Sequence, residues 1–215
     1  MRIALAGNPN SGKTTMFNAL TGMNEKVGNW AGVTVDKKEH PIKKSLYRGR
    51  DLIIVDLPGA YSMSPFTSEE SITSSYVKNE APDAIINIVD ATNLSRSLFF
   101  TTQLLELGIP MVVALNKTDV NDKKHNTIDA SELSKKLGCP VIETVSTNGR
   151  GVRDLVEAAV SRLGMTQTAP YSDNADAMSK EEAHAADTAR YAFVDGIVSA
   201  VCVMPRRDKI GRAHV

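Results

Sequence analysis

Hydrophobic and polar residues along the chain form two kinds of segment that alternate. One kind is a short apolar run rich in Ile, Val, Leu and Ala, which is typical of a buried strand; such runs lie at residues 2–6, 51–56, 84–90, 111–116 and 141–145. The other kind carries apolar residues three and four positions apart, as amphipathic helices do; these segments lie at residues 13–21, 94–107, 128–137 and 152–163. The alternation predicts an α/β fold, in which a mostly parallel sheet of about six to seven strands has helices on both faces.

The flanking segments differ from this pattern. Residues 33–46 are polar and contain Pro41, a combination that favours an edge strand next to a loop. Residues 164–178 are rich in Thr, Ser, Asp, Asn and Ala, as a linker would be. Ser179 followed by Glu182 is a helix-start signal, and the sequence predicts a helix from there to about Val203.

The composition is that of a globular protein. The 215 residues are 42% hydrophobic and 23% charged, which is enough for one main core. Lys plus Arg and Asp plus Glu both total 25, so the chain lacks the cationic excess typical of nucleic-acid binders, and we expect no nucleic-acid partner. Cys139 and Cys202 are too few and too far apart for a disulfide framework or a zinc site, so we expect both to be reduced packing residues.

The distribution of apolar residues shows neither a membrane-spanning helix nor a signal peptide. No run approaches the roughly 18 apolar residues that a membrane-spanning helix needs. The apolar run over residues 1–6 is too short for the core of a signal peptide. We therefore expect this fragment to be soluble and cytosolic.

The strongest motif follows the first predicted strand and opens the first predicted helix. It reads Gly7-Asn8-Pro9-Asn10-Ser11-Gly12-Lys13-Thr14-Thr15 and has the spacing and context of a phosphate-binding P-loop. In such a loop, backbone N–H groups converge on phosphates at a helix N-terminus, Lys13 reaches the β and γ oxygens, and the Thr14 hydroxyl ligates Mg²⁺. The predicted nucleotide-binding residues here are Asn8, Asn10, Ser11, Gly12, Lys13, Thr14 and Thr15.

A second motif, Asp56-Leu57-Pro58-Gly59, ends another predicted strand. Asp56 emerges at the carboxyl edge of the sheet, where ligands of α/β folds collect, so we expect it to hold Mg²⁺ through water while the Gly59 N–H senses a γ-phosphate. By itself this motif is more often a turn. Thr34 lies in the polar stretch after the first helix, and it could complete Mg²⁺ coordination when a γ-phosphate is present; without the other motifs it would be an edge-strand threonine.

The motif Asn116-Lys117-Thr118-Asp119 decides between guanine and adenine. A carboxylate at Asp119 can accept from both N1–H and the exocyclic amino group of guanine, whereas adenine would leave that charge facing an acceptor. Lys117 would lie along the base plane. Ser146, Thr147 and Asn148 follow the last predicted strand and could close over the base, although alone they would be an ordinary polar loop.

With these motifs in this order, the sequence closely resembles the family of ferrous-iron transporter B (FeoB). The similarity lies in five runs, of which Gly-Asn-Trp-Ala-Gly-Val-Thr at residues 28–34 is the most specific; the runs are residues 7–15, 27–35, 56–62, 87–94 and 103–110. The resemblance covers about residues 1–160 and implies a P-loop GTPase (G) domain over residues 1–163. Residues 164–178 would then be a linker, residues 179–210 a shortened helical segment and residues 211–215 a tail encoded by a vector.

The resemblance also implies a mechanism of hydrolysis. Ala60 stands where Ras-like switches have a glutamine, so this chain lacks the side chain that orients the hydrolytic water. Similar GTPases use K⁺ to offset charge at the phosphates. By resemblance Asn10 would ligate K⁺, helped by backbone carbonyls around Gly28 and Trp30, and the catalytic residues would be Asn10, Lys13, Thr34 and Gly59.

The expected function is therefore that of a GTP-binding, slowly hydrolysing switch of a ferrous-iron uptake transporter, activated by K⁺ and holding GTP or GDP with Mg²⁺. It would act at the cytoplasmic face of the bacterial inner membrane. The resemblance implies the membrane permease domain of the same polypeptide as partner, with a second copy of the chain and small accessory iron-transport proteins as further candidates.

Two other functions fit parts of the sequence. A ribosome- or tRNA-associated GTPase shares this style of P-loop, but it would need an RNA-binding module, and neither a KH loop nor a basic excess is evident. A nucleotide-sensing module with little hydrolysis would also fit Ala60. His184 with Glu181 and Asp187 could be offered as an iron site, but their spacing is typical of a solvated helix face.

Overall fold

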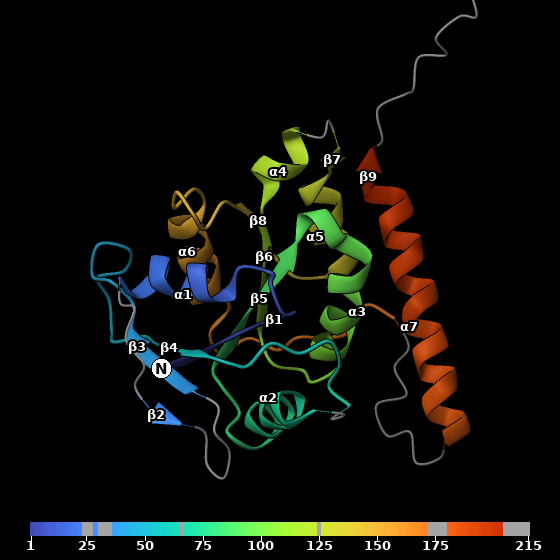
Figure 1. Cartoon of the computed structure of the whole chain (residues 1–215), viewed down its shortest axis with the longest axis horizontal. Helices are drawn as coiled ribbons and strands as arrows, with labels where there is room; N and C mark the ends of the chain where they lie inside the picture. The colour runs from blue at the N-terminus through green and yellow to red at the C-terminus, as the bar shows by residue number, and fades with distance from the viewer. Residues whose placement is uncertain (23–27, 30–35, 65–66, 124–125, 172–179, 204–215) are drawn as a thin grey trace, which may run out of the picture.

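The computed structural model describes residues 1–22, 28–29, 36–64, 67–123, 126–171 and 180–203 (Figure 1). Its centre is a seven-stranded sheet in the order β2-β3-β4-β1-β5-β6-β8. The strands are β1 (Arg2–Gly7), β2 (Gly28–Asn29), β3 (Asp36–Pro41), β4 (Ile53–Asp56), β5 (Ala84–Asp90), β6 (Met111–Asn116) and β8 (Val141–Thr144). The pairs formed by β4, β1, β5, β6 and β8 are parallel, and the edge pairs β2–β3 and β3–β4 are antiparallel. This confirms the predicted mostly parallel sheet. The polar stretch predicted as an edge strand contains β3, which pairs with β4 on one side and with the two-residue strand β2 on the other, so β2 is the edge strand.

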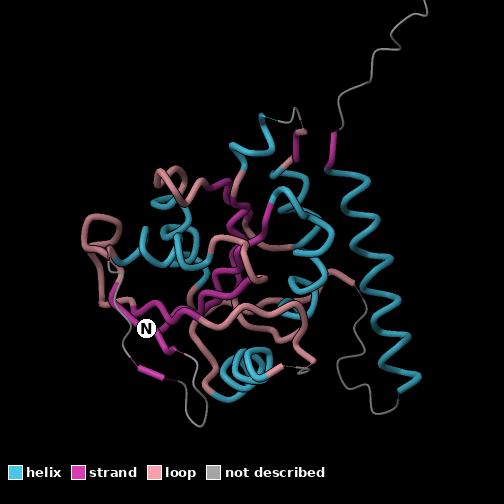
Figure 2. Tube along the Cα trace, in the orientation of Figure 1, coloured by secondary structure: helices cyan, strands magenta, loops and turns pink. Residues whose placement is uncertain are grey.

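Helices cover both faces of the sheet, as Figures 1 and 2 show. On one face, α1 (Lys13–Thr21) and α6 (Val152–Arg162) bury apolar residues against Ile3 and Leu5 of β1. On the other face, α2 (Ser68–Asn79), α3 (Leu94–Leu105) and α5 (Ala130–Leu137) pack against a cluster that includes Ala4 and Ala6. Neighbouring residues of β1 thus enter two different cores, because side chains alternate across a strand.

A third layer forms outside α3 and α5. Helix α7 (Lys180–Val201) packs on both helices and buries Val194, Ile197 and Val201, and Figure 1 shows it at the flank of the molecule. The chain then forms β9 (Cys202–Val203), which pairs antiparallel with β7 (Thr127–Ile128). The predicted C-terminal helix is present, and it ends at Val201 rather than Val203 because the last two residues complete this small sheet.

Two described helices were not predicted. Helix α2 begins after Thr67, whose hydroxyl accepts from the Glu70 N–H at 3.2 Å; Thr67 and Glu70 have the Thr-x-x-Glu spacing of a capping box, which is a sequence signal for this start. Helix α4 (Thr118–Lys123) directly follows β6. Within the described chain, no helix is long and apolar enough to cross a membrane.

Both cysteines are free thiols. Cys139 is buried, and burial raises its pKa to about 12, while Cys202 is half-buried and its pKa is raised by the same cause. This agrees with the expectation of reduced packing residues.

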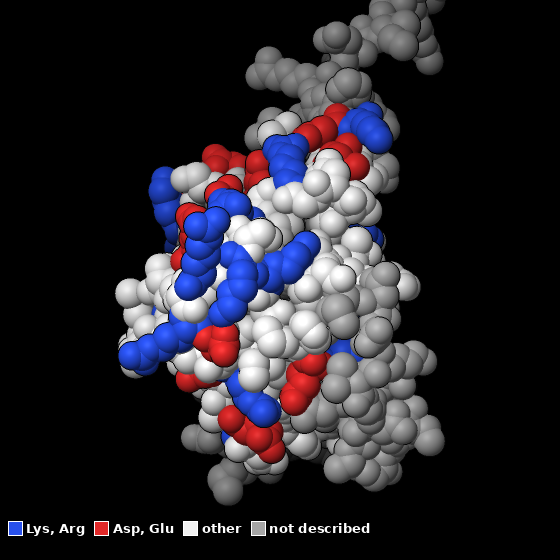
Figure 3. Space-filling view, turned by 90° about the vertical axis from the view of Figure 1, so that its left-hand side faces the viewer, with Lys and Arg blue, Asp and Glu red and all other residues white. Residues whose placement is uncertain are grey.

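Charged side chains form a mixed surface on the side of α1 and β3. Figure 3 shows Lys and Arg forming a band on this face, with Asp and Glu between them. Among the exposed ion pairs of the chain, the Lys44 ammonium lies 2.7 Å from the Asp51 carboxylate. This neighbouring acid fits the zero net charge of the chain.

A buried ion pair fastens α7 to α3. The Arg190 guanidinium donates to both Glu106 oxygens, with Nε 2.8 Å from Oε1 and Nη2 2.6 Å from Oε2. The two side chains are only 12% and 7% exposed. The hydrogen bonds from Arg190 to Glu106 raise the pKa of Arg190, so the guanidinium stays charged.

Removing one partner of this pair should cost much more stability than removing an exposed pair. Arg190→Met leaves the Glu106 charge buried, and we expect the free energy of unfolding in urea to fall by about 3–5 kcal/mol. The matched control is Lys135→Ala, which breaks a 3.6 Å pair with Glu132 whose lysine is 73% exposed and should cost less than about 1 kcal/mol. Equal losses for the two variants would contradict a structural role for the buried pair.

Candidate functional site

The loop between β1 and α1 folds so that backbone N–H groups are left for a ligand. Asn10 and Gly12 both have positive φ angles, 63° and 99°. Gly12 caps α1 without a side-chain hydrogen bond, so the first N–H groups of the helix have no partner from a capping side chain. An uncapped helix N-terminus after a tight loop is a site where anions bind.

Asn116 joins this loop to two other segments. Its side chain is 1% exposed, and its Nδ2 donates to the Ser11 carbonyl at 3.0 Å and to the Ser146 hydroxyl at 3.2 Å. Its Oδ1 accepts from the Ser146 N–H at 3.1 Å and the Thr144 hydroxyl at 3.3 Å. One amide therefore connects the P-loop, the end of β6 and the segment after β8.

Lys117 makes the next connection. Its backbone has a φ of 62°, and its ammonium donates to the Asn10 carbonyl at 2.7 Å and to Asp90 Oδ2 at 2.6 Å. The other Asp90 oxygen accepts from the Thr92 N–H at 2.9 Å, at the start of the short helix η1 (Ala91–Asn93). Asp90 was not among the predicted site residues; the signal for it was its position at the carboxyl end of the buried strand β5.

Buried polar groups gather around Lys13 at the start of α1. Lys13 Nζ lies 3.6 Å from Asp56 Oδ1. Burial raises the pKa of Asp56, and the charge of Lys13 partly opposes this shift. Both polar side-chain atoms of Asn8, the Ser11 hydroxyl and Asp56 Oδ1 are buried without a hydrogen-bond partner. Since buried polar groups in native proteins are nearly always bonded, this cluster fits a site that a polar ligand completes.

The segment after Asp56, residues 57–64, packs directly on the P-loop. A Cβ on Gly59 would lie 3.0 Å from three atoms of Pro9, so any larger residue would require Pro9 to shift by a few tenths of an ångström. Ala60 is fully buried, and its N–H donates to the Gly7 carbonyl at 3.3 Å. Ala60 therefore has no polar side chain with which to orient water, as expected from the sequence.

The remaining predicted residues lie around the same edge. Thr14 and Thr15 are exposed on the first turn of α1, and Asp119 is half-buried at the start of α4. The segment after β8 and helix α1 both contribute to the lining of a pocket of about 430 Å³. The predicted residues in that lining are Thr15, Ser146, Thr147 and Asn148.

Some predictions fall beyond the described residues. Thr34 and Trp30 lie outside them, and of Gly28 only the backbone is described, where it pairs with Lys37 in the β2–β3 ladder. The roles of Thr34 in Mg²⁺ binding and of Gly28 and Trp30 in K⁺ binding therefore stay predictions.

The residues offered as an iron site do not form one. In the part of the chain that the structure describes, no group of three or more His, Cys, Asp or Glu could hold a metal ion. Asp187 instead accepts from Arg190 Nη1 at 2.7 Å.

A parallel sheet with a P-loop after β1, Asp56 after β4 and an Asn-Lys-x-Asp motif after β6 defines a G domain of the P-loop GTPase fold. The chain belongs to the FeoB_N family, described as "Ferrous iron transport protein B", whose model matches residues 1–159.

Individual relatives agree with this assignment. The Fe(2+) transporter FeoB of Salmonella typhimurium strain LT2 is 50% identical over 159 residues, which are 72% of this chain and 20% of that protein. The Fe(2+) transporter FeoB of Escherichia coli K12 is 44% identical over 191 residues, 84% of this chain and 24% of that protein. The chain thus spans about a quarter or less of the curated relatives it matches.

Solved structures share the fold over nearly the whole chain. A mutant NFeoB of S. thermophilus bound to GDP superposes with a TM-score of 0.84 at 33% identity, covering 94% of this chain and 100% of that chain. The cytosolic domain of T. maritima FeoB in its GMPPNP form gives 0.83 at 26% identity, covering 95% and 100%. The predicted family and fold class are confirmed.

The contact between Gly12 and Asn116 can be tested by adding one methyl group. A Cβ at Gly12 would lie 2.4 Å from Asn116 Nδ2, so Gly12→Ala should displace the buried amide in addition to straining the backbone. The matched control is Gly138→Ala, where φ is also positive at 68° but nothing lies within 4 Å of the added Cβ. We expect about 1–2 kcal/mol of destabilisation for the control and about 1–3 kcal/mol more for Gly12→Ala.

Thermal or urea unfolding of the two variants measures this difference. Equal destabilisation would show that Asn116 adjusts freely, and that its hydrogen bonds do not fix the P-loop.

Proposed function

We propose that this chain binds GTP and GDP with Mg²⁺ and slowly hydrolyses GTP, as the switch domain of a ferrous-iron transporter. The observation that carries the proposal is the cluster of unpartnered buried polar atoms on Asn8, Ser11 and Asp56 beside Lys13. Polar atoms so placed stabilise the fold poorly without a ligand, and a phosphate with its metal ion would complete them.

The residues present fit Mg²⁺. Asp56 supplies a buried carboxylate oxygen without a hydrogen-bond partner, and the exposed Thr14 supplies a hydroxyl at the start of α1; both are the oxygen ligands that Mg²⁺ prefers. When bound, Mg²⁺ neutralises charge on the β and γ phosphates. Lys13 adds its own positive charge at the same end of the site.

The other end of the site fits guanine. Within the described residues, no hydrogen bond or ion pair occupies the Asp119 carboxylate, so it can accept two N–H groups from the base. Lys117 is fixed by Asn10 and Asp90, which holds its aliphatic stem in place along a bound base. Asn116 fixes the position of the Ser146 loop through two hydrogen bonds.

Hydrolysis without a glutamine needs another source of charge stabilisation. We propose that K⁺ supplies it, with Asn10 as a ligand, because Asn10 is exposed in the P-loop and carries an amide oxygen that can coordinate a cation. The comparable contribution of an arginine finger is about 10³–10⁵ in rate. Intrinsic turnover without an activating protein is expected to be slow.

The place of this domain in iron uptake follows from its relatives. Those proteins carry the name Fe(2+) transporter, and this chain matches about a fifth to a quarter of their length. We propose that the chain acts at the cytoplasmic face of the inner membrane, next to a permease region of the same polypeptide. Family membership favours this role over that of an RNA-associated GTPase.

Base specificity can be tested at Asp119. In Asp119→Asn the amide presents a donor and no charge, so GDP should bind at least about a hundredfold more weakly. Xanthosine diphosphate should bind better, because its 2-carbonyl can accept from the new amide. Calorimetric titration with GDP, ADP and xanthosine diphosphate measures the change, with Asp122→Asn, an exposed site on the same helix, as control. Unchanged GDP affinity would exclude Asp119 from the base site.

Potassium dependence can be tested with the same domain. GTP turnover should be faster in K⁺ than in Na⁺ at equal ionic strength, and Asn10→Ala should abolish the difference while GDP still binds. Equal rates in both salts with no effect of Asn10→Ala would overturn the K⁺ proposal.

A single-turnover measurement with the domain in excess over GTP tests the alternative of a nucleotide sensor, which the buried Ala60 favours. If the chain is only a sensor, the bound GTP should remain intact.

A further inference from the structure

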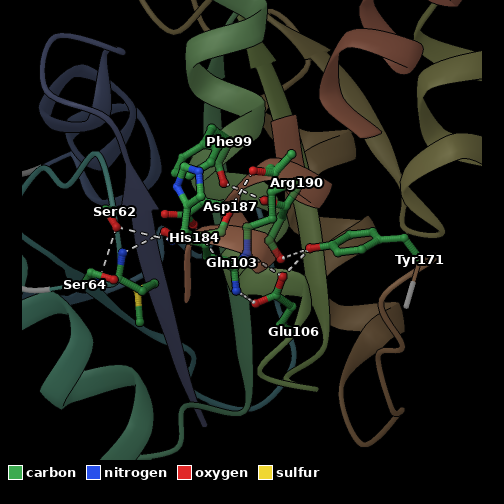
Figure 4. Close-up of polar contacts among 12 residues, drawn as sticks. Ser62, Ser64, Phe99, Gln103, Glu106, Tyr171, His184, Asp187 and Arg190 are labelled. Carbon is green, nitrogen blue, oxygen red and sulfur yellow. Dashed lines mark hydrogen bonds and ion pairs between the residues drawn. The ribbon is translucent and has the colours of Figure 1, made fainter. Parts of the chain in front are cut away.

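Helix α3 touches the 57–64 segment on one side and α7 on the other. Figure 4 shows Gln103 facing Ser62, and Glu106 between Arg190 and Tyr171. Gln103 lies in the last turn of α3, and Glu106, three residues later, is the C-cap that ends this turn, so both lie on the same side of the helix end. One turn of α3 therefore contacts both the segment beside the P-loop and the C-terminal helix.

The first set of contacts holds the 57–64 segment. Gln103 Oε1 accepts from the Met63 N–H at 2.8 Å, and its Nε2 donates to the Ser62 hydroxyl at 3.3 Å. Gln103 is only 6% exposed, so water cannot easily replace these bonds. About two helical turns earlier on α3, the Arg96 guanidinium lies 4.0 Å from the centre of the Tyr61 ring.

The second set of contacts holds α7. Glu106 accepts two hydrogen bonds from Arg190 and one from the Tyr171 hydroxyl. Phe99 stacks on Tyr191 with ring centroids 4.4 Å apart. Because a bidentate ion pair and a ring stack both depend on direction, they allow little sliding between α3 and α7.

The 57–64 segment is in turn linked to the phosphate end of the site. Gly59 packs on Pro9 of the P-loop. The Thr73 hydroxyl donates to the Pro58 carbonyl at 2.9 Å, and Glu70 accepts from the Tyr61 N–H at 3.1 Å. A displacement of Gly59 must therefore either break the hydrogen bonds of the 57–64 segment or move the side chains that form them. One of these side chains, Gln103, lies on α3.

We propose that Gln103 and Glu106 make α3 a coupling element between nucleotide state and the docking of α7. The proposal rests on the proposed function, since it assigns the γ-phosphate as the group that moves Gly59. By thermodynamic linkage the effect is reciprocal: if a GTP analogue changes how firmly α7 is held, then the docking of α7 changes the relative affinity for the GTP analogue and GDP by the same factor. Nucleotide state would thus be transmitted to the C-terminal flank of the domain.

The apolar side chains near the C-terminal end of α3 are packed so that this part of the helix should move as one unit. Phe100, Leu104 and Leu105 are fully buried in the apolar cluster that also includes residues of β5 and β6. Close-packed interiors shift between discrete arrangements rather than deform continuously. A displacement at Gln103 is therefore expected to reach Glu106 without being absorbed within the helix.

The test measures affinities for GDP and for a non-hydrolysable GTP analogue, together with hydrogen exchange of the α7 amides in each state. In the wild-type chain, α7 protection should differ between the two nucleotides. Gln103→Leu removes the bonds to Ser62 and Met63, and Arg190→Lys keeps the charge but loses the bidentate geometry. Each should change the affinity ratio of the two nucleotides by about fivefold or more.

The double variant provides the sharpest outcome. If both residues act in one series of contacts, Gln103→Leu with Arg190→Lys should change the affinity ratio no more than either single variant does. Additive changes, or equal α7 protection in both nucleotide states, would overturn the proposal. Ser95→Ala on α3 and Asp195→Asn on α7, both exposed, serve as controls and should leave the ratio unchanged.

Two further points keep the test decisive. Should Arg190→Lys not fold, Tyr191→Ala replaces it, because Tyr191 is 56% exposed and its removal breaks only the stack on Phe99. Failure of the proposed function is separate: it would appear as no guanine-nucleotide binding by the wild-type chain, whereas failure of the coupling appears as normal binding with no nucleotide effect on α7.

Discussion

The structure of the site depends on one buried side chain, the amide of Asn116. Parallel strands bring several loops to one edge of a sheet, but nothing in the sheet itself fixes how those loops lie relative to one another. The Asn116 amide does so, by donating to the Ser11 carbonyl and accepting from the Ser146 N–H. Asn116 lies at the end of β6, and Gly12 approaches it so closely that an added Cβ would lie 2.4 Å from its Nδ2. The loops that we propose to hold the phosphates and the base are therefore both positioned by this one side chain.

Several features of this site lower the stability of the folded chain. Asn10 and Lys117 have left-handed backbones that residues with side chains adopt only at an energetic cost, and Asp56 is buried with a raised pKa. The network around Lys117 offsets part of this cost through its charge-assisted bond to Asp90. Strain and unpartnered polar atoms remain where a ligand would bind, which is the expected distribution when a protein balances stability against function.

Sequence alone predicted those features that depend on local pattern. The buried strands were evident as apolar runs because both of their faces are covered, and the P-loop was evident because its spacing and its context agree. Helix α2 was missed because its apolar residues are few, although Thr67 and Glu70 marked its start. Asp90 could be suspected only from its position at the end of a buried strand. Its bond to Lys117 and the Glu106–Arg190 pair could not be predicted, since they join residues 27 and 84 positions apart whose proximity only the tertiary structure establishes.

The manner in which α7 is attached bears on what it can do. A helix bound only by apolar side chains is held by a non-directional interaction that tolerates sliding. Helix α7 has such a contact through Val194 and Ile197, but it also carries Arg190, whose two bonds to Glu106 require one register. Buried ion pairs add little net stability because desolvation offsets their attraction, and their best-attested effect is to specify register. A movement of α3 that changes this register would pull apart two buried charges, which is costly. The docking of α7 is therefore sensitive to the position of α3 in a way that a purely apolar contact would not be.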